Sequence, residues 1–438
     1  MTKNSGAELW RKAKKIIPGG NQLLSKRSEQ FLPEYWPSYY RKAQGVDVWD
    51  LDNNHYIDMS IMGIGACPLG YADPDVNAAV KSRIDNGSMC TFNSPEEIGL
   101  AEKLIQLHPW AEMVRYARCG GEAMAIAVRI ARAHTKQDVV AFCGYHGWHD
   151  WYLAANLADD RNLDGHLLPG LAPAGVPRGL AGTALPFQYN HTEELEAIIE
   201  RHPDKLAAII LEPVRDHDPA PGFLADVRKI ANENDAVLIA DEVSSGFRLR
   251  TGGAHLLHGM KPDIAVFAKA MSNGFPMAAI IGRENVMQAA QDTFISSTYW
   301  TEGVGPVAAL ATIAKYERCT VPDHLVRTGN AIQKGWIRAA DETGLEIAVG
   351  GIPPLSHFSF TGGQALEAQT IYTQMMLEKG ILAGKSFYAC YAHRDEHVEK
   401  YLDATTGVFE QIAKSMSTYS LESLLKGPAA KPGFHRLT

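Results

Sequence analysis

The chain has 438 residues, of which 46% are hydrophobic and 21% are charged. This is the composition of a soluble globular protein, and the length predicts two or three domains. The net charge of −8 disfavours nucleic acid or an anionic membrane as the main partner. The longest apolar runs have the length of strands, so no transmembrane helix is expected. The N-terminal stretch lacks the apolar core of a secretion signal, and the six cysteines show no CxxC spacing, which together indicate a cytoplasmic protein.

Near the N-terminus, local patterns predict a helix, a hairpin and a second helix. The first helix is expected to bury one apolar face made of Leu9, Ala13, Ile16 and Ile17. The stretch "VWDLDNNHYID" at 48–58 indicates a hairpin with Asn53 and Asn54 at its turn. In "NSPEEIGLAEKLIQL", Ser94 is predicted as a helix N-cap, with Glu97 three residues later completing a capping box.

From residue 113 to about 315, strand-like and helix-like segments alternate, which is typical of a mainly parallel sheet covered by helices. Several strand candidates are continuous apolar runs bounded by turn residues. The candidates are "MVRYA" (113–117), "VVAFC" (139–143), "LAAIILE" (206–212), "AVLIAD" (236–241), "DIAVFA" (263–268) and "MAAIIG" (277–282).

After residue 320 the pattern changes to fewer strands and two amphipathic helices, near 364–379 and 395–416. We therefore predict an α/β large domain at 66–318 and a smaller α+β domain at 319–438. The N-terminal segment, 1–65, is expected to pack with the small domain and to share its sheet.

In open α/β sheets, ligands collect beyond the carboxyl ends of the strands. After the 113–117 strand, Gly120 and Gly121 begin a helix and leave backbone N–H groups that suit a phosphate. A tight turn without a ligand explains the same glycines equally well. No GxGxxG follows a strand and no GxxxxGK[ST] is present, which disfavours a dinucleotide or P-loop site.

The loop after the 139–143 strand reads "GYHGWHD". Tyr145 can lay its ring on a planar ligand, or it is an ordinary loop tyrosine. His146 and His149 are interpreted as a surface pair. No metal site is predicted, because no carboxylate or cysteine ligand set accompanies them. The histidines of "AHLLHG", His255 and His258, are interpreted in the same way.

Three later strands end in charged residues: Glu212, Asp241 and Lys269. A carboxylate at the end of a buried strand needs a positive charge nearby. A direct Asp241–Lys269 ion pair is one interpretation. The alternative is a cationic ligand between them, because a pyridinium nitrogen needs a carboxylate and an aldehyde needs a lysine for a Schiff base. Burial lowers the pKa of a lysine and makes it a usable nucleophile and base.

With these residues assembled, the chain resembles class III pyridoxal-phosphate-dependent aminotransferases, and among them the glutamate-1-semialdehyde 2,1-aminomutase branch. None of the motifs is specific by itself. The combination of the spacing from "DEV" to the lysine with the motifs "YHG" and "EP" is specific to this family. The matching motifs cover most of the chain: "KKIIPGG", "VWDLDNNHYIDMS", "GEAMAIAVRIARAHT", "YHGWHD", "IILEPV", "LIADEVSSGFR", "PDIAVFAKAMSNGFP" and "YAHRDEHV". The resemblance implies the fold-type I architecture of pyridoxal 5'-phosphate (PLP) enzymes.

The resemblance also implies a role for each site residue. Lys269 would form the Schiff base with PLP and move the substrate proton. Asp241 would pair with the pyridinium nitrogen. The other residues that the resemblance places around the cofactor are Tyr145 on one ring face, Val243 on the other, Glu212 and His146 on the Asp241 side, and Cys119, Gly120 and Gly121 at the phosphate. Thr298 falls where the family has a phosphate-binding threonine donated by the neighbouring subunit, which implies a homodimer.

This sequence departs from the family at three places. The phosphate loop reads Cys119-Gly120-Gly121 where the family has Ser-Gly-Thr, so two hydroxyl donors are lost. A Gly-Asn-Pro after the threonine is replaced by 301–303, "TEG". The aminomutase's serine and arginine after "PGG" are replaced by "NQLLSKR", where Lys26 or Arg27 is predicted to hold an anionic substrate group.

The aminomutase's acidic residue before its C-terminal "AH" is also missing. We therefore predict intermolecular, ping-pong amino transfer between an amino donor and a keto or aldehyde acceptor. An intramolecular aminomutase or a racemase on the same scaffold is the alternative. A protein that keeps the fold as a binding or scaffold subunit is a third hypothesis, motivated by the altered phosphate loop.

Overall fold

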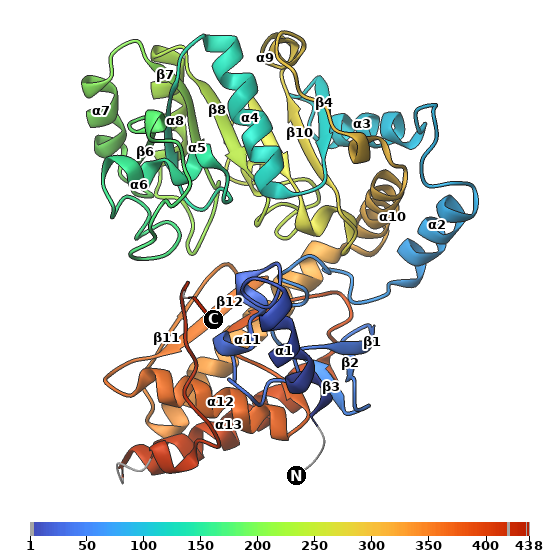
Figure 1. The fold of residues 1–438 in the computed structure, drawn as a ribbon, viewed down its shortest axis with the longest axis vertical. Helices are drawn as coiled ribbons and strands as arrows, with labels where there is room; N and C mark the ends of the chain where they lie inside the picture. The colour runs from blue at the N-terminus through green and yellow to red at the C-terminus, as the bar shows by residue number, and fades with distance from the viewer. Residues whose placement is uncertain (1–3, 418–420, 435, 438) are drawn as a thin grey trace. The chain divides into compact units, whose positions relative to one another are not determined.

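The computed structural model describes residues 4–417, 421–434, 436 and 437. The chain forms two compact units (Figure 1). One combines Met1–Asp73 with His324–Thr438, and the other is Pro74–Asp323. The divisions predicted from sequence lay at 65 and 318, a few residues before these two.

The 74–323 unit is built on a seven-stranded sheet with the order β4-β10-β9-β8-β7-β5-β6. Neighbouring strands from β9 to β6 run parallel, whereas β10 is antiparallel to both β4 and β9. The mainly parallel α/β prediction is therefore confirmed. The strands are β4 (Met113–Ala117), β5 (Val139–Cys143), β6 (Ala184–Pro186), β7 (Leu206–Leu211), β8 (Val237–Asp241), β9 (Ile264–Phe267) and β10 (Ala278–Gly282).

Helices pack on this sheet, and α4 crosses five of its strands: β4, β7, β8, β9 and β10. The helices of this unit are α2 (Pro74–Asp85), α3 (Glu96–Leu107), α4 (Gly120–Thr135), α5 (Asp150–Leu153), α6 (Ala155–Ala158), α7 (Thr192–Arg201), α8 (Phe223–Glu233), α9 (Glu284–Met287) and α10 (Val304–Cys319). Two 3₁₀ turns matter for the site, η5 (Lys269–Ser272) and η7 (Thr298–Thr301).

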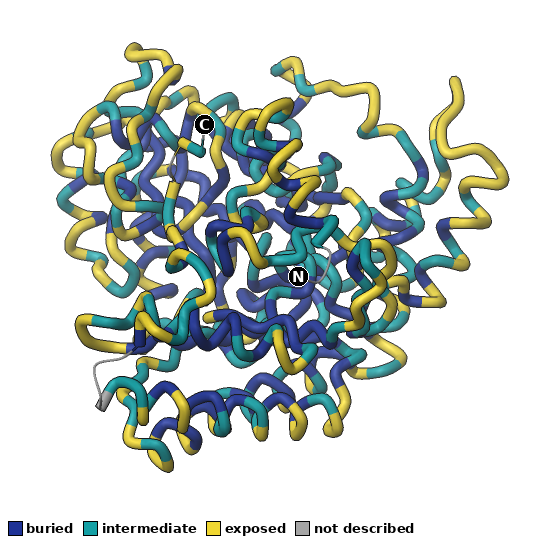
Figure 2. The backbone as a smooth tube through the Cα atoms, turned by 60° about the horizontal axis from the view of Figure 1, so that its bottom comes forward, coloured by how far each residue is buried: buried dark blue, intermediate teal, exposed yellow. Residues whose placement is uncertain are grey.

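The core lies between α4 and the sheet. Every residue of β5, β7 and β8 is buried, because strands covered on both faces carry continuous rather than alternating apolar residues. Figure 2 shows such long buried stretches inside an exposed surface. A polar side chain at the end of one of these strands is consequently held in a rigid, partly dehydrated setting.

The other unit contains two small sheets. The first joins β1 (Tyr40–Gln44), β2 (Asp47–Asp50) and β3 (His55–Asp58) to β13 (Ile381–Leu382). The N-terminal hairpin thus shares a sheet with a C-terminal strand. The second sheet contains only C-terminal strands: β11 (Ile347–Gly350), β12 (Leu355–Phe360) and β14 (Ser386–Tyr388). Its helices are α1 (Ser5–Ile16), α12 (Ala365–Glu378) and α13 (Asp395–Ser417), and α11 (Val321–Thr343) spans the junction of the two units.

Two local predictions are wrong. In α1 the buried residues are Gly6, Ala7, Trp10 and Ala13, whereas Leu9 and Ile16 are exposed. At the start of α3 the cap residue is Pro95, and the Ser94 hydroxyl donates to Glu96 instead of capping the backbone. Across the described residues, no helix combines the length and the apolar character that a membrane span requires.

Candidate active site

The candidate site lies in the 74–323 unit, where consecutive strands of the sheet reach their carboxyl ends. Glu212 follows β7, Asp241 ends β8, and Lys269 begins η5 directly beyond β9. Because β7, β8 and β9 are adjacent and parallel, these ends meet at one edge. Lys269 has a positive φ of 42°, a conformation that non-glycine residues seldom adopt and that is common at functional sites.

The nearest side-chain partner of Asp241 is a histidine. Asp241 is 2% exposed and its Oδ2 lies 2.7 Å from Nδ1 of His146, while its Oδ1 accepts from the backbone N–H of Val243 at 2.9 Å. Nε2 of His146 lies 3.2 Å from the carbonyl oxygen of Cys143. These contacts give the buried carboxylate hydrogen-bond partners on both of its oxygens. The interpretation of His146 as a surface residue is therefore wrong.

Lys269 is not paired with an acid. Its Nζ donates to Oγ of Ser244 at 2.8 Å, and no carboxylate of the described chain forms an ion pair with it. The direct Asp241–Lys269 pair is thus absent. Burial lowers the pKa of Lys269, and the nearby Arg248 lowers it further. A buried amine with a depressed pKa is suited to attack a carbonyl and to carry a proton.

Glu212 completes the acidic side of the site. Burial raises its pKa to about 7, and the neighbouring Asp241 contributes to the shift. Its Oε2 accepts from the backbone N–H of Tyr145 at 3.4 Å and lies 3.5 Å from Nε of Arg215. Gly144 has φ +119°, and a Cβ there would stand 2.6 Å from the same oxygen, so only glycine fits beneath the carboxylate. Tyr145 itself is exposed.

The loop at the start of α4 forms a cradle with no side chains. A Cβ at Gly120 would lie 2.7 Å from Cγ1 of Val243, and one at Gly121 would lie 3.2 Å from Nδ1 of His149. Cys119 is the N-cap residue and its side chain makes no capping hydrogen bond. The first backbone N–H groups of this 16-residue helix therefore face outward without a side-chain cap, as an anion site requires.

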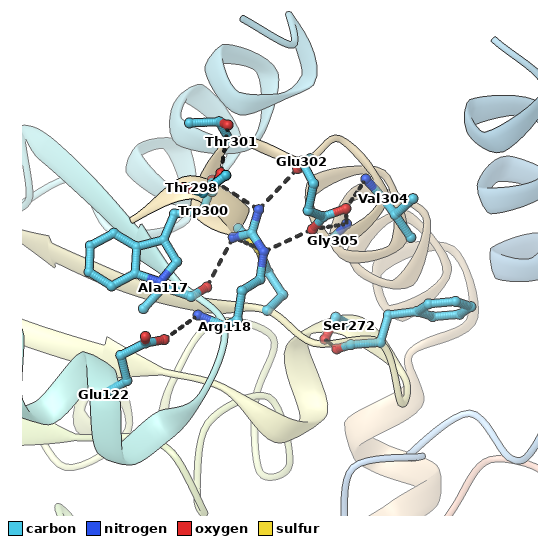
Figure 3. Close-up of polar contacts among 12 residues, drawn as sticks. Ala117, Arg118, Glu122, Ser272, Thr298, Trp300, Thr301, Glu302, Val304 and Gly305 are labelled. Atoms are coloured by element: carbon cyan, nitrogen blue, oxygen red, sulfur yellow. Dashed lines mark hydrogen bonds and ion pairs between the residues drawn. The ribbon is translucent and has the colours of Figure 1, made fainter. Parts of the chain in front are cut away.

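Arg118 ties this loop to the segment that carries Thr298 (Figure 3). Its Nη2 donates to the carbonyl oxygens of Trp300 and Glu302 at 2.9 and 3.0 Å, and its Nε forms an ion pair with Glu302 at 2.8 Å. Glu302 in turn accepts from the backbone N–H groups of Val304 and Gly305 at the start of α10. The family departures at the phosphate loop and at "TEG" are therefore connected through one partly buried charge pair.

The residues at this edge fit PLP. A carboxylate charge, an unpaired buried amine and a glycine-lined helix start match the ring nitrogen, the aldehyde and the phosphate of that cofactor. The cofactor would be held by Asp241, Lys269 and the amides of Gly120 and Gly121. No group of histidine, cysteine or carboxylate side chains in the described residues is arranged to bind a metal ion.

The predicted substrate-binding residues belong to the unit formed by 1–73 and 324–438. Lys26 ends a 3₁₀ turn in that unit, and the adjacent Arg27 lies 5.7 Å from the ring centre of Phe434. The interpretation of His255 as a surface histidine is wrong: it is fully buried and pairs with Glu242 at 2.7 Å. His258 is only partly exposed and lies 3.8 Å from Asp218.

Sequence reasoning missed Ser244, Arg248 and Arg118. Ser244 and Arg248 stand in the family motif "LIADEVSSGFR", so their nearness to Asp241 in the sequence was a usable signal. Arg118 directly precedes the altered phosphate loop, but its contact with Glu302, 184 residues away, has no local signal.

Comparison with known proteins gives a consistent assignment. The family model described as aminotransferase class-III matches residues 33–387. A 3-aminobutyryl-CoA aminotransferase of Cloacimonas acidaminovorans is 32% identical, over 93% of this chain and 97% of the relative. A glutamate-1-semialdehyde 2,1-aminomutase of Methanothermobacter thermautotrophicus is 33% identical, over 92% and 98%. The FumI protein of Sphingopyxis sp. MTA144, solved in its PLP internal aldimine form, superposes with a TM-score of 0.85 at 24% identity, covering 95% and 98%.

Proposed function

Because this chain belongs to the class-III aminotransferase family, whose cofactor is PLP, we propose that it transfers an amino group from a donor amine to a separate carbonyl acceptor, with Lys269 as the catalytic amine. One observation carries the proposal. The amine of Lys269 is partly buried and donates to Ser244 rather than to an acid, one strand away from Asp241, which is in contact with His146.

The cofactor, when bound, supplies a ring that withdraws electrons from the substrate α-carbon. The chain's own residues do the rest. Lys269 would hold the cofactor through its aldehyde and, once a donor amine has taken its place, would move the α-proton. Asp241 would hold the ring nitrogen, and His146, 2.7 Å away, would keep the carboxylate of Asp241 oriented. Tyr145 and Val243 would enclose the ring, and Glu212, which accepts from the backbone N–H of Tyr145, fixes the loop that carries Tyr145.

We further propose a homodimer in the cytoplasm. Thr298 is exposed at the start of η7, on a segment that Arg118 holds in place. An exposed hydroxyl on a fixed turn suits donation to the phosphate site of a second copy, as the family resemblance predicts. The phosphate of each site would then be bound by Gly120 and Gly121 of one subunit, beside Cys119, and by Thr298 of the other.

Intermolecular transfer is favoured over the aminomutase reaction by the substitutions after "PGG". Lys26 or Arg27 is proposed to bind an anionic group on one substrate. The aminomutase remains the second candidate, because a relative of that name is 33% identical over most of both chains. It would convert a single substrate without any added acceptor.

The test replaces Lys269 by alanine. The purified wild type is expected to show the visible absorbance of a lysine-bound cofactor, and Lys269→Ala to lose both that absorbance and turnover. Lys229→Ala, on the exposed face of α8, is the matched control. Wild-type protein loaded with pyridoxamine phosphate is then offered keto acids, aldehydes and keto sugars. Normal transamination by Lys269→Ala contradicts the proposal, and product from one substrate alone favours the aminomutase.

A further inference from the structure

The phosphate loop lacks the two hydroxyls that its family pattern provides, and the structure contains a side chain that can replace one of them. At Gly121, where the pattern has threonine, a Cβ would lie 3.2 Å from Nδ1 and 3.4 Å from Cε1 of His149. The imidazole therefore occupies the space beside Gly121 that a threonine side chain would need.

Nδ1 of His149 is buried and has no hydrogen-bond partner among the described residues. A buried polar atom without a partner costs stability, so a ligand that accepts a hydrogen bond from it would be favoured there. The atom stands beside the second residue of α4, where the unpaired N–H groups of the helix start gather. A ring N–H and these amides together offer several donors to a phosphate, while the nearby carboxylate of Glu122 accepts from the backbone N–H of Arg118.

The backbone around His149 supports this arrangement. Gly147 has φ +105°, and a Cβ there would lie 2.8 Å from Cα of Gly121. The loop after β5 therefore touches the start of α4 directly, and this contact brings the imidazole to the phosphate loop. The ring also stacks on Trp148, with 4.5 Å between centroids. Stacking limits the freedom of the ring, so a hydrogen bond from it costs little further entropy.

We propose that Nδ1 of His149 donates a hydrogen bond to the phosphate of the cofactor, in place of the hydroxyl that is missing at Gly121. The inference rests on the proposed function, because it requires the phosphate at the start of α4. Burial lowers the pKa of His149, against an opposing effect of Glu122 and Asp150. The neutral ring still carries one hydrogen, which suffices for this contact.

The experiment compares the affinity of apo protein for PLP with its affinity for pyridoxal, which lacks the phosphate. The variants are His149→Ala, His149→Asn, Gly121→Thr and the double variant His149→Ala with Gly121→Thr. His134→Ala, at the exposed end of α4, is the matched control. The ratio of the two dissociation constants, measured by equilibrium dialysis, reports the phosphate contact independently of the folded fraction.

His149→Ala is expected to weaken PLP binding about 10- to 100-fold, the effect of losing one hydrogen bond to a charged group, and to leave pyridoxal binding unchanged. Gly121→Thr alone should also weaken PLP binding, because its side chain meets the imidazole. In the double variant the threonine has room, and its hydroxyl should restore the ratio to within about threefold of wild type. In His149→Asn the amide N–H can take the place of Nδ1–H, so this variant should keep most of the wild-type preference for PLP over pyridoxal.

A purely structural role for His149 predicts a different pattern. Affinities for PLP and pyridoxal would then fall together, and threonine at 121 would worsen the defect of His149→Ala. Either result, or an unchanged ratio in His149→Ala, overturns the inference. If His149→Ala does not fold, the ratio of the PLP and pyridoxal dissociation constants in His149→Asn and Gly121→Thr decides between the two roles. Failure of the proposed function is recognised separately, because Lys269→Ala would then keep its absorbance and turnover.

Discussion

Asp241 and Glu242 are adjacent carboxylates, both buried, and each pairs with a histidine at 2.7 Å. Their surroundings differ, because consecutive side chains of an extended segment point to opposite sides. Glu242 accepts from the ring and backbone N–H of His255 and from the hydroxyl of Ser245. Nε2 of His255 accepts in turn from Trp110 at 3.2 Å, so this network is closed within the protein.

The network of Asp241 is not closed in the same way. The charge of Asp241 raises the pKa of Glu212. It also raises the pKa of Lys269, but burial and Arg248 lower that pKa by more. These two neighbours are both shifted toward their neutral forms. A buried charge whose hydrogen-bond partners all come from the protein has a structural role. A buried charge whose neighbours can change their protonation state is suited to bind a charged ligand. The two carboxylates should therefore respond differently to mutation.

The largest effect is expected at the Glu242 pair. His255→Ala leaves a buried carboxylate without its main partner, which costs about 3–5 kcal/mol of unfolding free energy. Burial raises the pKa of Glu242, but the hydrogen bonds from His255 and Ser245 outweigh it, and the net pKa lies below the usual value of 4.5. Stability from a lowered carboxyl pKa is present above the unfolded value and lost as pH falls through the folded one.

The cost of His255→Ala should therefore be largest near neutral pH and shrink below about pH 4.5. Urea denaturation at pH 7 and pH 4 measures it, with the exposed His134→Ala as control. Folded His255→Ala should still bind PLP with wild-type affinity. If His255→Ala instead had normal stability but no longer bound PLP, Glu242 rather than Asp241 would be the carboxylate that serves the cofactor.

The next effect is expected at Asp241. Asp241→Asn keeps the shape and the acceptor for the N–H of Val243, but removes the charge that holds the ring nitrogen of the cofactor. Turnover should fall by about 10²- to 10³-fold, the usual cost of losing one preorganised electrostatic contact. Single-turnover amino transfer measures this, and the melting temperature of the apo protein should change little. A variant with turnover within about tenfold of wild type would show that Asp241 does not hold the ring.

The contrast between the two carboxylates also shows what sequence can predict. The apolar runs located the strands, and their charged ends located Glu212, Asp241 and Lys269, because parallel strands end at one edge. His146 was misplaced on the surface, since its burial follows from packing between the loop and β8 and leaves no trace in local polarity. The apolar face of α1 was misjudged for a similar reason: Trp10 is buried and pairs with Glu29 through its ring N–H.

Contacts between residues far apart in the sequence could not be predicted. Arg118 and Glu302 lie 184 positions apart, and only the sheet brings β4 near the start of α10. The position of His149 depends on the positive φ of Gly147, which a sequence permits but does not specify. The two glycines of "GYHGWHD" therefore predicted a loop, but the sequence did not predict which residue would approach each glycine.

The smallest effect is expected at Glu212, and it tests the open network directly. Burial, followed by the charge of Asp241, raises its pKa to about 7. A raised carboxyl pKa gives stability below the unfolded value of 4.5 that is lost as pH rises through about 7. The buried charge of Glu212 should therefore destabilise the apo wild type at pH 8, whereas Glu212→Gln carries no charge at this position.

Apo Glu212→Gln should be close to wild type in stability at pH 5 and more stable at pH 8 by about 3 kcal/mol, the value that corresponds to a pKa raised from 4.5 to about 7. Thermal melting at both values measures the difference, and the exposed Glu196→Gln should show none at either. The same substitution made in Asp241→Asn gives the sharper result. Removing the charge of Asp241 lowers the pKa of Glu212, so the advantage at pH 8 should shrink. If it persists undiminished, burial alone shifts Glu212, and the two acids do not share the electrostatic network that separates Asp241 from Glu242.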